Sequence, residues 1–232
     1  GDVRTGSSER RSLAVTNDGN ATLEVDPSSI SGSDADAFTI VSGEQTSLAP
    51  GETETYSVAF GPDEEAEGYS ATFELTSNDR NLSVPLAGDG IAGNASLSPS
   101  TRDFGSVQLG SSREQTFTFA NDGTAQLEIT SVSVTGDDAS AFSVSGLSTG
   151  TVDADGSKNF NVTSSPSVTG SATATLEIGT AQAGTTTASL GVTGVEQDIE
   201  LDTESLAFDR TRLGTTTITT LTISNPGNAP LN

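Results

Sequence analysis

A seven-residue pattern, Asn-x-Gly-x-Ala-x-Leu, occurs three times in this 232-residue chain at a constant spacing. Its copies begin at Asn17, Asn121 and Asn225, each 104 residues after the one before. Apolar residues ahead of the pattern keep the same register, as Leu13 and Phe117 do. A period of this length has the size of a whole domain and exceeds the roughly 20–50 residues of solenoid repeats. The sequence therefore predicts tandem copies of one domain.

The register predicts where these copies begin and end. Residues 1–91 form a unit without its leading strand, residues 92–195 form a complete unit, and residues 196–232 hold the first strands of a third. The predicted linkers are residues 88–93 and 193–196, each between the last strand of one unit and the leading segment of the next.

The leading segment of the third copy could be exchanged into the first unit of another molecule, as in strand-addition polymers. Two periods account for 208 of the 232 residues, so 24 residues would be supplied twice. This excess disfavours a clean exchange. We expect instead that the chain is a window from a longer array.

Short segments in which apolar and polar residues alternate dominate the chain, and no window has a helical period. Phe117 and Phe119, for example, share one face while Thr116 and Thr118 share the other. Turn signals such as Asn-Asp-Gly follow these segments, which predicts a β-sandwich. The other predicted strands are 37–40, 55–60, 71–75, 82–86, 127–129, 142–144, 160–162, 175–178 and 189–192.

Two smaller predictions concern local geometry. Pro85 has no backbone N–H to donate, so its strand is expected at a sheet edge or its proline at a bulge. Asp34 and Asp138 share one register position and are expected to cap a turn through a side-chain oxygen.

Several motifs resemble a known family. Residues 97–99 and 104–110, followed by 117–123, resemble the start of a choice-of-anchor D repeat, and residues 32–38 and 136–142 resemble its central motif. That family belongs to the ASH/Hydin-like, major-sperm-protein-like immunoglobulin superfamily. The resemblance implies an all-β fold of tandem immunoglobulin-like β-sandwich domains, of the kind found in surface proteins, ciliary proteins and trafficking adaptors.

Charge limits the partners that the chain can have. Thirty-two Asp and Glu residues face nine basic ones, which gives a net charge of −23. Such a surface repels nucleic acid and anionic membranes, so neither is predicted as a partner. We interpret the charge as adaptation of a halophilic, archaeal protein, because at about 1 M salt the Debye length falls to about 3 Å. An acidic surface protein from a mesophile is the alternative.

Catalytic chemistry is largely excluded by composition. The chain has no His and no Cys, which rules out a Ser-His-Asp triad, a Cys-His pair and a His-ligated zinc site. Lys158 falls in a predicted polar turn and is not expected to activate a serine. Paired carboxylates could hydrolyse glycosides, but the acidic residues fall on turns and outward positions and no Trp could stack a sugar. No enzyme activity, catalytic residue or cofactor is predicted.

Two short motifs resemble binding loops. Residues 88–93 match Gly-x-Gly-x-x-Gly, but a strand with proline follows where the dinucleotide fingerprint needs a helix. Residues 153–156, Asp-Ala-Asp-Gly, resemble part of a calcium loop, but residues 161–172 supply no acidic ligand. The first is therefore interpreted as a linker and the second as a solvated turn, with no metal site.

Four asparagines begin Asn-x-Ser/Thr sequons and are candidates for N-glycosylation if the protein is exported. They are Asn20, Asn81, Asn94 and Asn161, of which Asn94 on the linker and Asn81 in a hairpin turn are expected to be most accessible.

These observations predict a non-catalytic structural or adhesive segment of an extracellular, cell-surface array, such as a surface filament. Its predicted partners are neighbouring repeats or like subunits. A ligand-binding module that recognises carbohydrate or protein through loops at one end is an alternative. The acidic run 64–67, which has no acidic counterpart in the second unit, would fit that reading. A viral or appendage structural protein is a further alternative.

Overall fold

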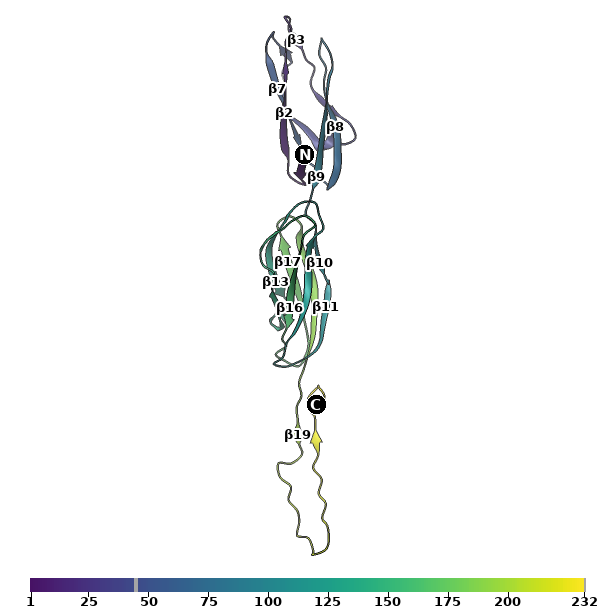
Figure 1. Ribbon diagram of the computed structural model, residues 1–232, viewed down its shortest axis with the longest axis vertical. Helices are drawn as coiled ribbons and strands as arrows, with labels where there is room; N and C mark the ends of the chain where they lie inside the picture. The colour runs from purple at the N-terminus through teal and green to yellow at the C-terminus, as the bar shows by residue number, and fades with distance from the viewer. Residues whose placement is uncertain (44–45, 232) are drawn as a thin grey trace. The chain divides into compact units, whose positions relative to one another are not determined.

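Alternating side chains place one face of nearly every strand in a core, and the chain folds as two β-sandwiches. The computed structural model describes residues 1–43 and 46–231 and divides into two compact units. Strands account for about 55% of it and helices for about 3%, so the predicted all-β, immunoglobulin-like fold is confirmed. We call the part built from β1–β9 the first sandwich and the part built from β10–β18 the second sandwich (Figure 1).

The second sandwich packs two sheets against each other. One has the order β10 (Ala95–Ser98), β12 (Arg113–Asn121), β16 (Ser157–Ser164) and β14 (Phe142–Ser145). The other has the order β11 (Thr101–Gln108), β18 (Gly184–Val195), β17 (Gly170–Thr180), β13 (Leu127–Thr135) and β15 (Gly150–Val152). β11 runs parallel to β18, whereas β17 is antiparallel to both β18 and β13.

Aromatic rings fill the space between these sheets. Phe117 is fully buried and stacks on Phe160 with ring centroids 5.7 Å apart. Phe104, 1% exposed, lies 5.7 Å from Phe142 across the core. Burying one such side chain contributes about 1.5–3 kcal/mol, so the predicted alternation of apolar residues accounts for the main stabilising contacts.

The first sandwich repeats this plan with shorter strands. One sheet has the order β1 (Asp2–Arg4), β9 (Leu82–Ile91), β8 (Ala66–Leu75) and β4 (Ser29–Ser31). Its second sheet has the order β2 (Glu9–Thr16), β7 (Thr53–Phe60) and β5 (Phe38–Ser42), and β3 (Leu23–Glu24) pairs with β6 (Ser47–Leu48). Tyr56 and Phe73, both 1% exposed, meet edge to face at 5.4 Å in its core.

The two sandwiches differ at one sheet edge. In the second sandwich β10 covers the edge of β12, whereas β2, which corresponds to β12 in the 104-residue register, ends its sheet with an open edge. β1 pairs only with the end of β9, from Asp2 opposite Asp89 to Arg4 opposite Ile91. Pro85 therefore lies where β9 has β8 on one side and, within the described residues, no strand on the other. This agrees with the prediction of an edge position.

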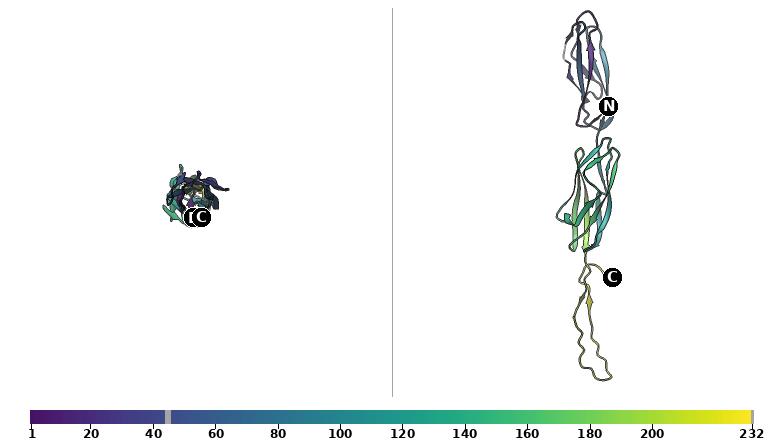
Figure 2. Two further views of the ribbon diagram at one scale, coloured as in Figure 1. Left: turned by 90° about the horizontal axis from the view of Figure 1, so that it is seen from above. Right: turned by 60° about the vertical axis from the view of Figure 1, so that its left-hand side comes forward.

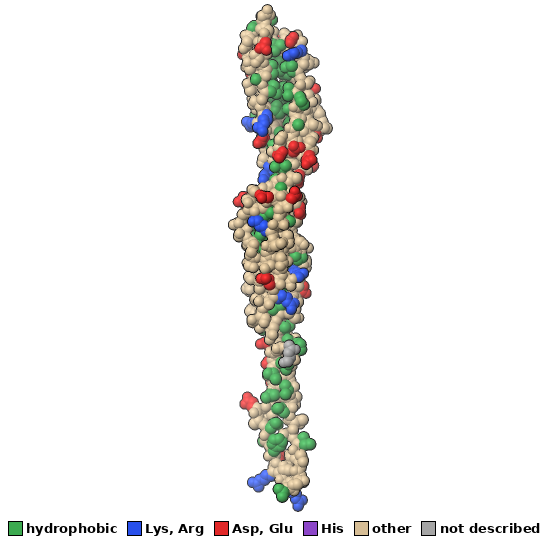
Figure 3. Space-filling view, in the orientation of Figure 1, with side chains coloured by type: hydrophobic (Ala, Val, Ile, Leu, Met, Phe, Trp, Pro, Cys, Tyr) green, Lys and Arg blue, Asp and Glu red, His purple; other side chains and the backbone are tan. Residues whose placement is uncertain are grey.

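The third repeat forms an extended hairpin in the described residues 196–231 (Figure 2). Its strands β19 (Glu200–Leu201) and β20 (Ile223–Ser224) make two antiparallel residue pairs. The predicted end of this repeat, residue 232, lies outside the described residues. Apolar side chains are exposed along the hairpin, among them Leu213 and Ile218 (Figure 3).

The predicted linkers are too long. Residues 88–91 belong to β9 and residues 193–195 belong to β18, so the segment between sandwiches begins at Ala92. Glycines occur in β9 because a Cβ on Gly88 would lie 2.4 Å from the Phe60 ring, and one on Gly90 would lie 2.3 Å from the Glu64 carbonyl oxygen. Close packing across the sheet explains the glycine pattern that was interpreted as a linker.

The prediction for Asp34 and Asp138 is wrong in detail. Each precedes a single 3-10 turn, η1 (Ala35–Ala37) or η2 (Ala139–Ala141), but neither makes a side-chain cap to its own turn. The Asp34 carboxylate instead accepts a 2.9 Å hydrogen bond from the Ser70 backbone N–H, and Asp138 accepts one of 2.9 Å from Thr173. Backbone carbonyls, such as those of Gly32 and Gly136, already accept hydrogen bonds from the N–H groups of each 3-10 turn. The two carboxylates therefore link each turn to the neighbouring strand. Ala37, predicted as strand, ends η1.

Candidate functional site: the Asn-Gly turn

The repeated pattern folds as the same turn in all three copies. In the second sandwich Asn121 Nδ2 donates to the Ala125 carbonyl at 2.8 Å, and its Oδ1 accepts from the Gly123 N–H at 3.2 Å. The corresponding distances are 2.8 and 3.0 Å at Asn17, and 2.7 and 3.1 Å at Asn225. Asparagine is needed because its amide both donates and accepts within the turn. We call residues 17–23, 121–127 and 225–231 the first, second and third turns.

The second turn binds the segment that enters the second sandwich. The Ala125 N–H donates to the Ala92 carbonyl at 2.8 Å, and the Asp122 N–H donates to the Asn94 carbonyl at 2.8 Å. The Asn94 N–H in turn donates to Asn121 Oδ1 at 3.1 Å. We call residues 92–94 the connecting segment. Its backbone is thus hydrogen-bonded at both ends by the turn.

The middle glycine of the pattern permits this close approach. A Cβ on Gly123 would lie 2.4 Å from the Ala92 carbonyl oxygen and 2.6 Å from the Asn94 nitrogen, too close for any real side chain. Gly93 faces a similar limit, because its Cβ would lie 2.5 Å from the Leu127 side chain. Both glycines therefore let two backbones pack in contact. The pattern showed an invariant glycine, but the sequence gave no sign of what packs against it.

The arrangement recurs 104 residues later. The Ala229 N–H donates to the Glu196 carbonyl at 3.0 Å, and the Glu196 N–H donates to Asn228 Oδ1 at 2.6 Å. A Cβ on Gly227 would lie 2.4 Å from the Glu196 carbonyl oxygen. Glu196 corresponds to Ala92, so the third turn binds its own connecting residue in the same way.

Asp153 is hydrogen-bonded to the second turn through both its backbone and its side chain. Asn121, fully buried, donates a further hydrogen bond of 3.0 Å to the Asp153 carbonyl, and Gln126 Nε2 donates to the Asp153 carboxylate at 2.8 Å. Asp155 adopts a positive φ of 56° in the same loop, consistent with the predicted turn. Within the part of the chain that the structure describes, no group of three acidic side chains could hold a metal ion.

The first turn has the same internal bonds but an open surface. Gly19 is exposed, and the nearest atom to a Cβ on it would be Asn17 Oδ1 at 3.1 Å. Ala21 is exposed, whereas the corresponding Ala125 is 3% exposed. A cavity of about 420 Å³ opens beside this turn, lined by its residues and by residues 77–80 and Leu82. No sequence signal distinguishes this turn from the second.

The structure places the four sequon asparagines in different settings. Asn20 in the first turn, Asn81 between β8 and β9, and Asn94 in the connecting segment are exposed. Asn161 lies half-buried in β16, where its Oδ1 accepts a 3.0 Å hydrogen bond from Thr116 Oγ1. Three of the four are therefore open to a modifying enzyme, and their glycosylation remains a prediction.

Lys158 and the acidic run 64–67 lie in different settings. Lys158 lies half-buried in β16, opposite Phe119, and not in a polar turn as predicted, because the strand begins at Ser157. The acidic residues Glu64, Glu65 and Glu67 are all exposed. No helix among the described residues is long and apolar enough to cross a membrane.

Comparison with known families and structures identifies the domain type. Residues 94–194 match the model of the HYDIN/CFA65/VesB-like Ig-like domain, and residues 1–83 match the ASH (ASPM-SPD-2-Hydin) model. Comparison with curated proteins found no match.

Several solved structures align with this chain at low sequence identity. The extracellular cadherin domains 1–4 of protocadherin gamma B7 align with a TM-score of 0.50 and 11% identity, covering 98% of this chain and 57% of that one. A Porphyromonas gingivalis W83 protein of unknown function aligns with a TM-score of 0.38 and 16% identity, over 82% of this chain and 93% of that one. The PapD-like domain 7 of human CEP192 aligns with a TM-score of 0.37 and 16% identity, over 46% of this chain and 89% of that one. On the two family matches, this chain consists of tandem immunoglobulin-like domains of the ASH/Hydin type, as its sequence motifs implied.

Proposed function

We propose that the chain is a non-catalytic structural segment of an extracellular array, in which repeated sandwiches provide length and the second and third turns each fix the segment that enters their own repeat. Domains of this type are structural or binding modules. The observation that supports the structural role is the connecting segment. β9 ends at Ile91 and the next residue, Ala92, is already hydrogen-bonded to Ala125. The segment that enters the second sandwich is therefore hydrogen-bonded from its first residue.

The energetics favour an ordered connection. Ordering one residue costs about 1–2 kcal/mol of backbone entropy, and each hydrogen bond returns about 0.5–1.5 kcal/mol. Four hydrogen bonds hold Ala92 and Asn94, so bonding returns about as much free energy as ordering three residues costs and leaves little surplus. Contact between Gly93 and the Leu127 side chain adds apolar burial. We therefore expect the close packing at Gly93 and Gly123 to decide whether the connecting segment stays ordered.

The acidic surface supports the proposed setting. Thirty-two acidic residues against nine basic ones, with a net charge of −23, keep a protein hydrated and soluble in concentrated salt. The exposed sequons at Asn20, Asn81 and Asn94 are compatible with an exported surface protein. A halophilic source and a place on the cell surface are parts of this proposal.

Hydrogen exchange of the full chain tests the role of the turn. The amides of Asp122 and Ala125 should be protected in the unaltered protein, because they donate to the connecting segment. Gly123→Ala should push that segment away and remove this protection. Gly19→Ala is the matched control, since the first turn has the same internal bonds and no segment packed on its glycine. Protection that survives Gly123→Ala, or amides that exchange freely in the unaltered chain, would overturn the proposal.

A further inference from the structure

An early strand and the last strand of the second sandwich lie side by side in one sheet. β11 and β18 pair in parallel, from Thr101 opposite Ser189 to Gln108 opposite Val195. A pull along the chain enters this sandwich ahead of β11 and leaves it after β18. Because the two strands run in the same direction, such a pull drags them past each other along their length. The load then falls on all the hydrogen bonds between them at once, whereas an antiparallel pair would open one bond at a time.

The ladder between these strands is closed at both ends. Ahead of the first residue pair the Ser189 N–H donates to the Ser100 carbonyl at 3.0 Å. Beyond the last pair the Leu109 N–H donates to the Val195 carbonyl at 2.9 Å. Six residue pairs lie between these bonds, in two runs separated by a bulge. Hydrogen bonds in a parallel ladder are evenly spaced, so a lengthwise load is spread over both runs.

Side chains hold β11 in place as well. Phe104 and Val107 are 1% and 4% exposed, so β11 cannot slide without drawing both side chains out of the core. At the bulge the Phe104 carbonyl accepts a 2.5 Å hydrogen bond from Arg113 Nη1, and Arg102 donates to the Gln115 side chain. Arg113 and Gln115 belong to β12, in the opposite sheet. β11 is therefore tied to β18 by its backbone and to β12 by side-chain hydrogen bonds.

We propose that the second sandwich bears mechanical load along the chain, and that the β11–β18 pair is the element that resists it. This inference rests on the proposed function, because a segment that gives an array its length transmits any pull on that array. The bonds between the connecting segment and the second turn meet the load first. The β11–β18 pair then sets the rate at which the sandwich unfolds, and that rate governs forced unfolding.

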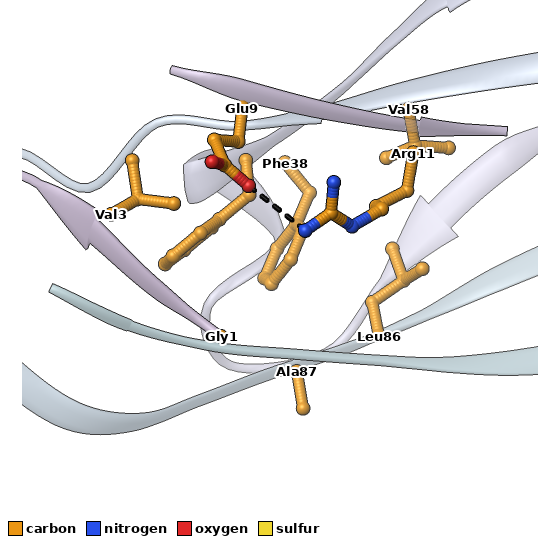
Figure 4. A pocket seen from close by; sticks show the side chains of 9 residues that line it. Gly1, Val3, Glu9, Arg11, Phe38, Val58, Leu86 and Ala87 are labelled. Atoms are coloured by element: carbon orange, nitrogen blue, oxygen red, sulfur yellow. Dashed lines mark ion pairs between the residues drawn. The ribbon is translucent and has the colours of Figure 1, made fainter. Parts of the chain in front are cut away.

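The first sandwich carries a change at one of these bonds. Pro85 stands at the position of Ser189 and has no N–H to donate. β9 nevertheless stays a regular strand at this point, since Pro85 pairs with Thr72 of β8. Beside a cavity of about 110 Å³, Leu86 and Ala87 then point to opposite sides of β9 (Figure 4). Proline at this position therefore removes one donor and leaves the strand and its other pairing intact.

Single-molecule pulling on the full chain tests the geometry. Because the chain has no cysteine, two introduced thiols can carry the handles and confine the load to the second sandwich. Thr101→Cys with Glu196→Cys pulls β11 and β18 along their length. Thr101→Cys with Ser133→Cys keeps the first attachment and pulls across the sheet, because Ser133 of β13 lies in a row with Glu177 of β17 and Thr187 of β18. All three substituted side chains are exposed.

The two directions should differ in the folded lifetime at a fixed force. Under lengthwise load the sandwich should stay folded about tenfold longer or more, because several hydrogen bonds must break together and each contributes a factor of about 2–12. Across the sheet the same bonds break in turn. Equal lifetimes in the two directions, or a shorter one under lengthwise load, overturn the proposal.

Ser189→Pro tests the role of a single bond. Under lengthwise load it should shorten the folded lifetime about 2- to 12-fold, because one hydrogen bond of the loaded pair is lost. Val144→Ala is the matched control, since Val144 lies half-buried in β14, an edge strand of the opposite sheet that pairs with β16. It should lower the urea midpoint of the second sandwich and leave the lifetime under load unchanged.

A lifetime that Ser189→Pro leaves unchanged, or that Val144→Ala shortens as much, overturns the proposal. The comparison of pulling directions needs no proline, so it decides the matter even if Ser189→Pro fails to fold. Hydrogen exchange at Asp122 and Ala125 reports separately on the connecting segment. Protected amides with equal lifetimes in the two directions overturn this inference alone, and unprotected amides overturn the proposed function.

Discussion

Gly123 and Ala92 approach so closely that a Cβ on Gly123 would lie 2.4 Å from the Ala92 carbonyl oxygen. The same relation holds between Gly227 and Glu196, again at 2.4 Å. Two residues that are distant in sequence thus keep one geometry in successive repeats. A turn that only reversed the chain would tolerate a side chain here, so contact with the connecting segment is what requires glycine at positions 123 and 227.

Asn121→Ala should destabilise the second sandwich. Asn121 is fully buried, and its side chain bonds Ala125, Gly123 and the Asp153 carbonyl. Its loss leaves buried groups without partners, at a cost of about 1–3 kcal/mol. In urea unfolding of the full chain, the transition of the second sandwich should have a lower midpoint.

Asn225→Ala is the matched control for that substitution. Asn225 makes the same internal bonds in an exposed turn, where water replaces them, so its removal should cost under about 0.5 kcal/mol. Equal effects of the two substitutions would show that the burial of Asn121 in the second sandwich contributes nothing.

Tyr56 should make the first sandwich sensitive to alkali. Burial raises the pKa of Tyr56 above its ordinary value of 10.0, and the neighbouring Glu54 carboxylate raises the pKa further. Below pH 10 both folded and unfolded chains hold the proton, and the stabilisation is fully present. As the pH rises from 10.0 through the folded pKa, only the unfolded chain ionises, so stability falls.

Urea midpoints of the first sandwich between pH 8 and 11 measure this effect. Tyr56→Phe should flatten the decline above pH 10. The second sandwich has Phe160 at the corresponding position and serves as an internal control. A decline of the same slope in Tyr56→Phe would rule out Tyr56 as its source.

Low salt should destabilise the protein if its charge reflects life in brine. Diluting from about 1 M to about 0.05 M salt lengthens the Debye length from about 3 Å to more than 10 Å, so exposed carboxylates repel one another. The melting temperature should fall. Replacing Glu64, Glu65 and Glu67 by Gln should weaken this dependence, because all three are exposed and close in sequence. A melting temperature that stays flat or rises on dilution counts against the halophilic interpretation.

Glycans should be found at the exposed sequons if the protein is exported. Asn81 and Asn94 are exposed, whereas the Asn161 side chain is half-buried and bonded to Thr116. Mass spectrometry of native material should detect hexose-containing adducts at the first two and none at Asn161. Unmodified peptides across all four sequons would remove this support for a surface location.

The sequence was sufficient to predict strands because one face of each is buried. Phe117 and Phe119 alternate with threonines, and both are fully buried as that pattern requires. The contact of Asp34 with Ser70 could not be predicted, because it depends on which strand lies beside the turn. The same holds for Gly123, whose invariance was visible in the sequence but whose neighbour, Ala92, is fixed only by the tertiary fold. Long-range backbone contacts leave no periodic signal.

Separate expression of the two units tests the repeat boundaries. Residues 92–195 should fold as a cooperative monomer, since β10 covers the edge of β12. Residues 1–91 expose the edge of β2 beside an apolar cavity and should aggregate or unfold at a lower temperature.

Fusing a leading segment ahead of Gly1 should rescue the first unit. Burial of one Leu and one Phe contributes about 3 kcal/mol or more, which for a domain of this size raises the melting temperature by roughly 12–24 °C. Residues 196–208 should rescue better than residues 92–104. Arg102 is hydrogen-bonded to Gln115 in the second sandwich, and the first sandwich has Arg11 at the position of Gln115, so residues 92–104 would bring two like charges together. Leu206→Arg in the fused segment should reduce the rise in melting temperature to that given by residues 92–104. If the rise is unchanged, repulsion from Arg11 does not determine which segment stabilises the first unit. If residues 1–91 alone melt as sharply as residues 92–195, the unit boundaries drawn from the 104-residue register are wrong.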